Sequence, residues 1–285
     1  MEQIKYSNQF FNIKDTLECG QIFRFKPFKQ GFLVISKCKI AYCYEEKDFV
    51  NIICEKQDKE YFTNFFDLER EYALIFNSAR NSNIEILKTA AESGKGIRIL
   101  KQDALEMLFS FIISQNNNIP RIKGSIEKLC ALFGEKKTFL GEEYYTFPNL
   151  SSLKTSSIES LKSIGLGYRA EYIYNLIKLL DEGLDINGYA NLQTEDLKNQ
   201  LLTIKGVGPK VADCVLLFGF NRSDTFPVDT WIEKVYKEDF NGKIKRREEQ
   251  AKWFVSEFKE NAGYFQQYLF AYKRLNGKNN NKIDK

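Results

Sequence analysis

Two charged residues, Lys210 and Asp229, stand where their side chains could act on a substrate. Lys210 follows the run Gly206-Val207-Gly208-Pro209. Because proline suits the first position of a helix, Lys210 should lie in a first helical turn, where the helix dipole disfavours a cation. The same field favours the neutral amine that a nucleophile needs. Lys210 is therefore a candidate nucleophile, and the alternative is an exposed lysine that binds phosphate.

Asp229 closes the run Phe226-Pro227-Val228-Asp229 and precedes Thr230-Trp231-Ile232. An aspartate at this point is a natural N-cap of a helix. A carboxylate fixed in this way could also stabilise positive charge while a glycosidic bond breaks. Capping alone is the alternative interpretation.

The segment just before Lys210, between its helix and the preceding one, predicts a phosphate-binding hairpin. Gly206 and Gly208 flank the apolar Val207, and two glycines allow a tight turn with exposed backbone N–H groups. Such groups at a helix N-terminus can bind a phosphate without side-chain charge. The alternative is an ordinary corner between two helices.

The composition of the chain excludes several kinds of catalytic site and metal site. The chain has 285 residues, a net charge of +4 and no histidine, which excludes Ser-His and Cys-His nucleophile pairs and histidine metal ligands. Any general acid or base must therefore be an Asp, Glu, Lys, Tyr or Cys side chain. Its six cysteines show no C-x-x-C spacing, so we expect reduced thiols rather than disulfides or a zinc site. We expect no membrane span and no secretory signal.

The pattern along the chain predicts an α+β fold. Residues 21–54 are rich in Phe, Ile, Val and Tyr and should form antiparallel strands. From residue 103 the spacing is helical, with Asp103 as a cap and a capping box at Ser156 and Glu159. We expect a small N-terminal antiparallel β domain (1–96), a helical domain (97–285) and a disordered tail (278–285).

The run G-V-G-P-K followed by P-V-D resembles the helix-hairpin-helix superfamily of DNA glycosylases. In that superfamily a lysine after the hairpin marks the bifunctional members, which form a Schiff base with the sugar. No cysteine follows Cys214, so the iron–sulfur cluster of the adenine and oxidised-pyrimidine enzymes is not expected. Six segments instead resemble the eukaryotic-type 8-oxoguanine DNA glycosylases: 19–24, 109–112, 116–121, 165–170, 210–214 and 262–266.

This resemblance implies how a flipped base is held. Gly20 would accept a hydrogen bond from the N7–H that oxidation adds to guanine, with its backbone carbonyl. Cys214 and Phe270 would sandwich the base, and Gln266 would contact its Watson–Crick edge. Gln266 and Phe270 are four residues apart and so share one helix face. The alternative is that both face an ordinary core, as a small buried Cys214 also could.

The resemblance also implies how the opposite strand is held. Asn116 would fill the gap in the base stack, Arg121 and Arg169 would bind the orphaned cytosine, and Tyr168 would wedge beside it. Solvated surface charge is the alternative for each arginine. Trp231, also expected to contact DNA, stands where the eukaryotic members often have a histidine near a DNA phosphate. Its indole N–H can donate one hydrogen bond but carries no charge, so the histidine's exact role cannot be carried over. The hairpin backbone at Leu202, Ile204 and Val207 could hold a structural cation.

We therefore predict a bifunctional glycosylase and AP lyase that flips out 8-oxoguanine opposite cytosine and excises it through a lysine Schiff base. It should need no catalytic metal or organic cofactor. Its partner should be duplex DNA, bound by a monomer in the cytoplasm of a bacterium or the nucleus of a eukaryote. The alternatives are a glycosylase for another lesion, such as an oxidised pyrimidine, and a non-catalytic hairpin module that only binds duplex DNA.

Overall fold

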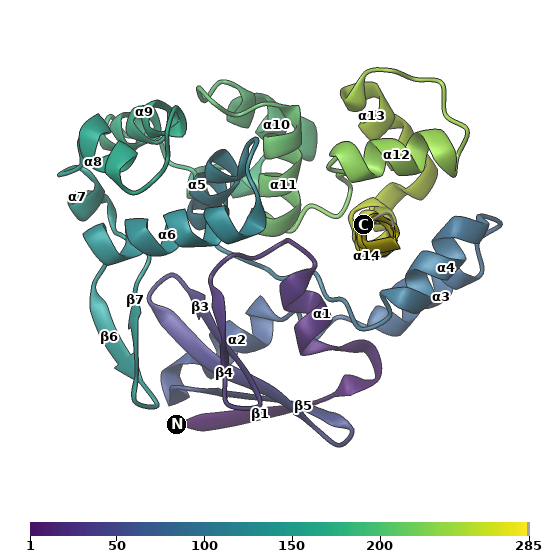
Figure 1. The fold of residues 1–285 in the computed structure, drawn as a ribbon, viewed down its shortest axis with the longest axis horizontal. Coiled ribbons are helices and arrows are strands. Elements are labelled where there is room, and N and C mark those ends of the chain that lie inside the picture. Colours follow the sequence, from purple (N-terminus) through teal and green to yellow (C-terminus); the bar gives the residue numbers. More distant parts are fainter. Residues whose placement is uncertain (284–285) are drawn as a thin grey trace.

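The computed structural model describes the backbone of residues 1–283 and the side chains of residues 1–275. Within that part, an antiparallel sheet near the N-terminus precedes a larger set of helices (Figure 1). The predicted α+β fold is thus confirmed. The tail predicted to be disordered (278–285) instead continues α14 (Ala262–Ile283) as far as its last residue, and residues 284–285 lie outside this description.

Five strands form the sheet, in the order β1-β5-β4-β3-β2, and each neighbouring pair is antiparallel. The strands predicted within residues 21–54 are present, whereas β1 was not predicted. Only Ile4 and Tyr6 are apolar in β1, so its alternation is too short to signal a strand before its pairing with β5 is known. The bounds are β1 (Glu2–Ser7), β2 (Phe25–Phe28), β3 (Gly31–Ser36), β4 (Lys39–Glu46) and β5 (Phe49–Cys54).

Two short helices, α1 (Ile13–Glu18) and α2 (Lys59–Phe65), contact strands of this sheet (Figure 1). Asn12 caps α1 by accepting a hydrogen bond from the Asp15 N–H. The helices and strands share a buried apolar cluster that includes Phe11, Ile13, Leu17, Val34, Ile52 and Phe62. This packing fixes the chain just before Gly20.

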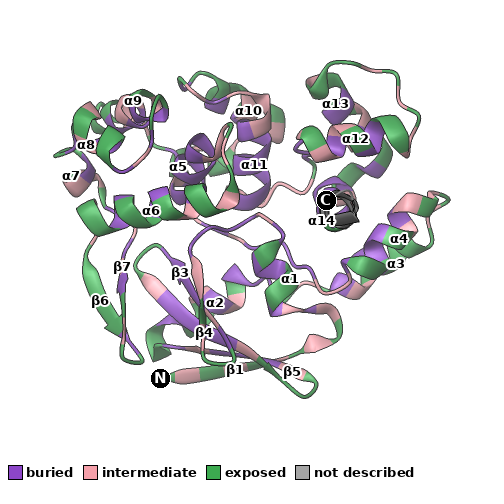
Figure 2. Ribbon diagram, viewed as in Figure 1, coloured by how far each residue is buried: buried purple, intermediate pink, exposed green. Residues whose placement is uncertain are grey.

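The central pair of helices is α5 (Ala104–Ser114) and α11 (Pro209–Gly219), which pack against each other. Figure 2 shows both as largely buried. Asp103 caps α5 as predicted, because its carboxylate accepts a hydrogen bond from the Glu106 N–H at 2.9 Å. The other helices are α3 (Tyr72–Arg80), α4 (Glu85–Ser93), α6 (Ile119–Phe133), α7 (Leu150–Leu153), α8 (Ile158–Ser163), α9 (Arg169–Asp181), α10 (Thr194–Leu202), α12 (Thr230–Glu238), α13 (Arg247–Phe258) and α14 (Ala262–Ile283).

Two local features differ from the sequence expectation. A second antiparallel hairpin, β6 (Lys136–Phe139) and β7 (Glu142–Tyr145), interrupts the helical part. Its turn at Leu140–Gly141 has positive φ at both residues, and Phe139 packs on the first sheet. The capping box also lies one residue later than predicted, with Ser157 and Ser160 bonding each other's backbone N–H at 3.1 and 2.9 Å.

The helices α3 and α4 precede residue 96 but share their buried core with the helical part, and α4 packs against α14. The ion pair of Arg24 with Glu106, at 3.2 Å, joins the sheet region to α5. The division of the chain between residues 96 and 97 stays a prediction. Among the described helices, none is both long and apolar enough to cross a bilayer.

Candidate active site

The hairpin between α10 and α11 has the geometry that its glycines predict. Gly206 has φ +92°, and a side chain there would lie 2.5 Å from the Tyr172 ring. The Val207 N–H donates to the Ile204 carbonyl at 2.9 Å, which closes the turn. Beside Gly208, the N-cap of α11, a Cβ would meet no atom within 4 Å. A phosphate can therefore approach the first turn of α11 closely.

Lys210 lies in that first turn, as predicted, and is half-buried. Its Nζ lies 5.1 Å from the centre of the Phe111 ring. The ring face attracts a cation, while the positive end of the helix dipole opposes one. The amine is thus held by contacts inside the protein rather than extended into solvent.

Asp229 caps α12, as predicted, through a single carboxylate oxygen. Its Oδ1 accepts hydrogen bonds from the N–H groups of Trp231 and Ile232, both at 2.9 Å. Neither of these bonds uses Oδ2. Asp229 and Lys210 form no ion pair with one another within 4.0 Å in the described structure. The carboxylate is therefore fixed in direction while one oxygen remains available to a bound group.

One pocket brings the predicted chemistry together. It has a volume of about 50 Å³ and is lined by both candidate catalytic residues and by all four residues expected to contact the base. The side chains come from α11, α14, the turn after α1 and the cap of α12. The predicted members are Gly20, Lys210, Cys214, Asp229, Gln266 and Phe270, and the unpredicted ones are Cys19, Phe111, Phe218, Pro227 and Gln267.

Gly20 occupies a turn with φ +96°, a conformation that favours glycine. A side chain at this position would meet the Phe270 ring at 3.4 Å, so Gly20 and Phe270 lie next to each other in the lining of the pocket. The next residue, Gln21, is fully buried and fixes the turn. Its amide donates to the carbonyls of Thr16 and Arg98 at 3.0 and 2.7 Å.

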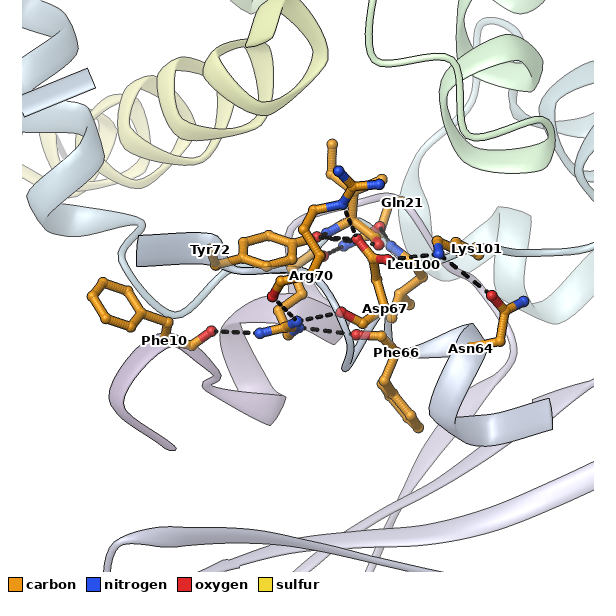
Figure 3. Close-up of polar contacts among 11 residues, drawn as sticks. Phe10, Gln21, Asn64, Phe66, Asp67, Arg70, Tyr72, Leu100 and Lys101 are labelled. Carbon is orange, nitrogen blue, oxygen red and sulfur yellow. Dashed lines mark hydrogen bonds and ion pairs between the residues drawn. The ribbon is translucent and has the colours of Figure 1, made fainter. Parts of the chain in front are cut away.

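The frame beneath this turn is drawn in Figure 3. Gln21 also accepts a hydrogen bond from the Leu100 N–H at 2.8 Å. The fully buried Arg98 donates to the carbonyls of Phe10 and Phe66 and lies 3.9 Å from the centre of the Tyr72 ring. A buried polar network of this kind, with its groups paired, holds a backbone in one position. The turn that carries Gly20, which lines the pocket, is thereby held in one position.

Cys214 on α11 also lines the pocket. Burial raises the pKa of its thiol to about 11, against the opposing effect of the nearby Lys210 charge. The thiol is therefore neutral at pH 7 and offers the pocket a polarisable, uncharged surface. Cys214 and Phe270 both line the pocket, and the sandwich of a base between them stays a prediction.

Gln266 has an amide held at both ends. Its Nε2 donates to the Pro227 carbonyl at 3.1 Å, and its Oε1 accepts from the Nε2 of Gln267 at 2.7 Å. Gln267 was missed in the sequence because it lies one residue from Gln266, off the i, i+4 face shared with Phe270. Phe218 was missed although it follows Cys214 by four residues, a spacing that could have indicated it.

The segment expected to enter the base stack lies beside the hairpin. Asn116 is exposed with φ +45°, and its Nδ2 lies 3.4 Å from the hydroxyl of the half-exposed Tyr168. Gln115 joins this segment to the hairpin, because its Nε2 donates to the Gly206 carbonyl at 2.7 Å. Asn116 and Tyr168, predicted separately, thus lie together beside the hairpin.

The two arginines predicted to bind the orphaned cytosine differ in how far their side chains are exposed. Arg121 is exposed near the start of α6, and its contact with the orphaned cytosine stays a prediction. Arg169 is only 4% exposed, and its guanidinium donates to the carbonyls of Gln115 at 2.8 Å and of Asn116 at 2.9 Å. In this structure Arg169 holds the Asn116 segment, so a contact with a base requires it to exchange these partners.

Trp231 is half-buried at the start of α12, and its ring lies 5.1 Å from the Lys234 amine. It lies outside the shared pocket. The cation predicted at the backbone of Leu202, Ile204 and Val207 stays a prediction. One lone pair of the Ile204 carbonyl oxygen already accepts a hydrogen bond from the Val207 N–H. Among the described residues, no cluster of three or more Cys, Asp or Glu side chains could hold a metal ion.

Comparisons with known proteins cover nearly the whole chain. Residues 3–108 match the family model of the 8-oxoguanine DNA glycosylase N-terminal domain, and residues 109–259 match that of the HhH-GPD superfamily base excision DNA repair proteins. A probable N-glycosylase/DNA lyase of Methanothermobacter thermautotrophicus is 32% identical, over 78% of this chain and 77% of that protein.

Solved structures agree with this assignment. MBOgg1 in complex with a low-affinity DNA ligand superposes with a TM-score of 0.90 at 34% identity, over 96% of both chains. The 8-oxoguanine glycosylase/lyase of Clostridium acetobutylicum, in complex with duplex DNA containing cytosine opposite 8-oxoG, gives 0.89 at 32% identity, over 94% of this chain and 93% of that one. The chain therefore belongs to the 8-oxoguanine DNA glycosylase family, within the HhH-GPD superfamily of base excision DNA repair proteins.

Proposed function

We propose that this chain is a DNA glycosylase and AP lyase that excises 8-oxoguanine opposite cytosine, with Lys210 as nucleophile and Asp229 as its electrostatic partner. One observation carries the assignment of residues. The two charged side chains singled out from the sequence and the four residues expected to hold the base all line one pocket. They come from four separate segments of the chain, so their convergence does not follow from local sequence spacing.

The reaction begins when the hairpin backbone binds a phosphate and the damaged nucleotide leaves the duplex, at an unstacking cost of roughly a few kcal/mol. The base enters between Cys214 and Phe270, where the Gly20 carbonyl accepts the N7–H and Gln266 contacts the pairing edge. Guanine lacks that proton because its N7 is an acceptor, so a carbonyl opposite N7 repels the undamaged base.

Neutral Lys210 then attacks C1′. The bond from C1′ to the base nitrogen breaks with its electron pair going to the base, while a bond from Nζ to C1′ forms. Positive charge develops on the sugar, and the carboxylate of Asp229 stabilises it. Loss of a proton from Nζ and opening of the sugar ring leave a Schiff base. Loss of a C2′ proton with departure of the 3′ phosphate then nicks the strand.

Borohydride trapping tests this proposal, because it reduces a Schiff base to a stable crosslink. The substrates are duplexes with 8-oxoguanine, an oxidised pyrimidine or undamaged guanine opposite cytosine. We expect excision and a crosslink with 8-oxoguanine far above the others. A crosslink formed mainly with the pyrimidine lesion would show that an oxidised pyrimidine, and not 8-oxoguanine, is the substrate. Binding of the duplexes without any crosslink would show that the chain only binds DNA.

The site of action follows from the substrate. A repair enzyme of chromosomal DNA works where the chromosome lies. We place the protein at the nucleoid, in the cytoplasm, if its source is a bacterium, or in the nucleus if the source is a eukaryote.

A further inference from the structure

One glutamine joins the hairpin to the segment expected to enter the base stack, and the mechanism above gives it no role. Gln115 directly follows α5 and is half-buried. Its Nε2 donates to the Gly206 carbonyl at 2.7 Å and to the Ile112 carbonyl at 3.1 Å. Both partners are acceptors, so a flipped amide would set its own oxygen against two carbonyl oxygens. The amide therefore keeps its donor end on the hairpin.

The backbone of the same residue is bound by a third element, the start of α9. The Gln115 carbonyl accepts hydrogen bonds from the Nε of Arg169 at 2.8 Å and from the Tyr168 hydroxyl at 3.5 Å. Arg169 also donates to the carbonyl of the next residue, Asn116, at 2.9 Å. Gln115 is thus the point where hydrogen bonds tie the end of α5, the hairpin and the start of α9 together.

The residue that follows Gln115 has an uncommon backbone conformation. Asn116 has φ +45°, in the left-handed region, which is costly for a residue other than glycine. Such a conformation persists only where surrounding contacts fix it. Here the Gln115 amide and the Arg169 guanidinium supply those contacts. Loss of the amide donor should therefore let the backbone of Asn116 relax out of this conformation.

We propose that Gln115 is a positioning residue that holds Asn116 at a fixed place beside the phosphate-binding hairpin, ready to fill the base stack as the damaged base leaves. This inference rests on the proposed function, since it takes the hairpin as the phosphate site and Asn116 as the residue that enters the stack. Gln115 acts through Asn116 and is not itself a catalytic residue.

The hairpin has a support that does not involve Gln115. The Tyr172 ring packs so closely on Gly206 that a Cβ there would lie 2.5 Å from it. Binding of a phosphate should therefore survive the loss of the Gln115 amide, and only the step that needs Asn116 should become slower. That step is the extrusion of a stacked base, which an abasic site does not require.

The test compares two single-turnover rates within one preparation: release of 8-oxoguanine opposite cytosine and cleavage of an abasic site opposite cytosine. Gln115→Met keeps the length of the side chain and removes its donor, and Gln115→Ala removes the whole amide. In both variants the ratio of release to cleavage should fall about fivefold, because one hydrogen bond changes an equilibrium by roughly two- to tenfold. Cleavage of the abasic duplex should stay within about twofold of the wild type.

The matched control is Gln250→Met, the same substitution in a buried amide of α13 whose Nε2 donates to the Ile244 carbonyl at 2.8 Å. Gln250 does not line the base pocket, so its ratio should equal that of the wild type even where its melting temperature falls. An unchanged ratio in the Gln115 variants, or an equal fall of both rates, overturns the inference. A wild type that does not excise 8-oxoguanine would instead overturn the proposed function.

Discussion

Replacing Asp229 by asparagine separates its two predicted contributions, capping and charge. Oδ1 accepts both capping hydrogen bonds, from Trp231 and Ile232, at 2.9 Å. Asparagine carries the same amide oxygen at the same place, so both bonds can persist. What the substitution removes is the negative charge on the oxygens that line the pocket.

The expected magnitudes differ enough to be told apart. Asparagine caps about as well as aspartate, and a charge at a helix N-terminus contributes about 0.3–1 kcal/mol to stability. Loss of a preorganised group that stabilises transition-state charge slows a reaction by roughly 10²–10³-fold. Asp229→Asn should therefore melt within a few degrees of the wild type and react tens to hundreds of times more slowly.

The assay is single-turnover release of 8-oxoguanine, together with thermal unfolding of the same preparations. Asp229→Ala is the matched comparison, because it removes the cap as well and should cost a further ~0.5–2 kcal/mol of stability. We expect the two variants to share the slow rate and to differ in melting temperature. If Asp229→Asn reacts as fast as the wild type, the carboxylate is a cap and the charge argument fails.

Further predictions concern Lys210, the two arginines and the buried Asp213. Lys210→Gln should abolish excision and the borohydride crosslink while lesion-containing duplex still binds. Arg121→Ala should relax the preference for cytosine over adenine opposite the lesion, by tens-fold in single-turnover rates, since charged hydrogen bonds contribute about 1.5–3 kcal/mol each. Arg169→Ala should relax it too and also lower the melting temperature, because Arg169 holds the Asn116 segment. Burial raises the pKa of Asp213 to about 6, above its ordinary value, so the unfolding free energy should fall as pH rises from about 4 to 7, and Asp213→Asn should flatten that fall in urea melts.

Each of these has an outcome that contradicts it. Wild-type excision by Lys210→Gln would exclude the nucleophile assignment. Equal wild-type rates opposite cytosine and adenine would show that Arg121 and Arg169 make no base contact. For Asp213, the folded-state pKa exceeds the unfolded one, so the stability carried by the protonated form is lost on passing pH 6. A wild type whose stability rises over that range as steeply as that of the asparagine variant would show that Asp213 does not titrate this way.

Sequence spacing predicted the parts of the site that depend on local rules. The proline and glycines of the hairpin set the start of α11, and so the position of Lys210, while Asp229 follows from capping preference. Gln266 and Phe270 share a pocket because residues four apart share a helix face. These relations involve neighbours along the chain, and the sequence displays them directly.

What the sequence missed depends on partners distant along the chain. Arg169 is buried because its guanidinium donates to the carbonyls of Gln115 and Asn116, about fifty residues earlier. The sequence around Arg169 does not indicate these partners. Gln267 faces the pocket because α14 is enclosed by other elements at its start, so more than one of its faces is buried. The sequence predicted helix where the hairpin of β6 and β7 lies. The burial of Phe139 depends on its packing against the first sheet, and the local sequence does not show that packing.

The helix α11 carries Gly208 at its cap, Lys210 in its first turn and Cys214 one turn further on. A helix rises about 1.5 Å per residue, so these three points keep fixed spacings that thermal motion hardly alters. This helix therefore cannot stretch to suit a substrate, and fitting a duplex to these three points requires the DNA to deform. Duplexes that kink easily, at pyrimidine–purine steps or beside a mispair, should then be engaged at lower energetic cost than stiff A-tracts. Repair along a chromosome would on this view be faster where the double helix is locally soft.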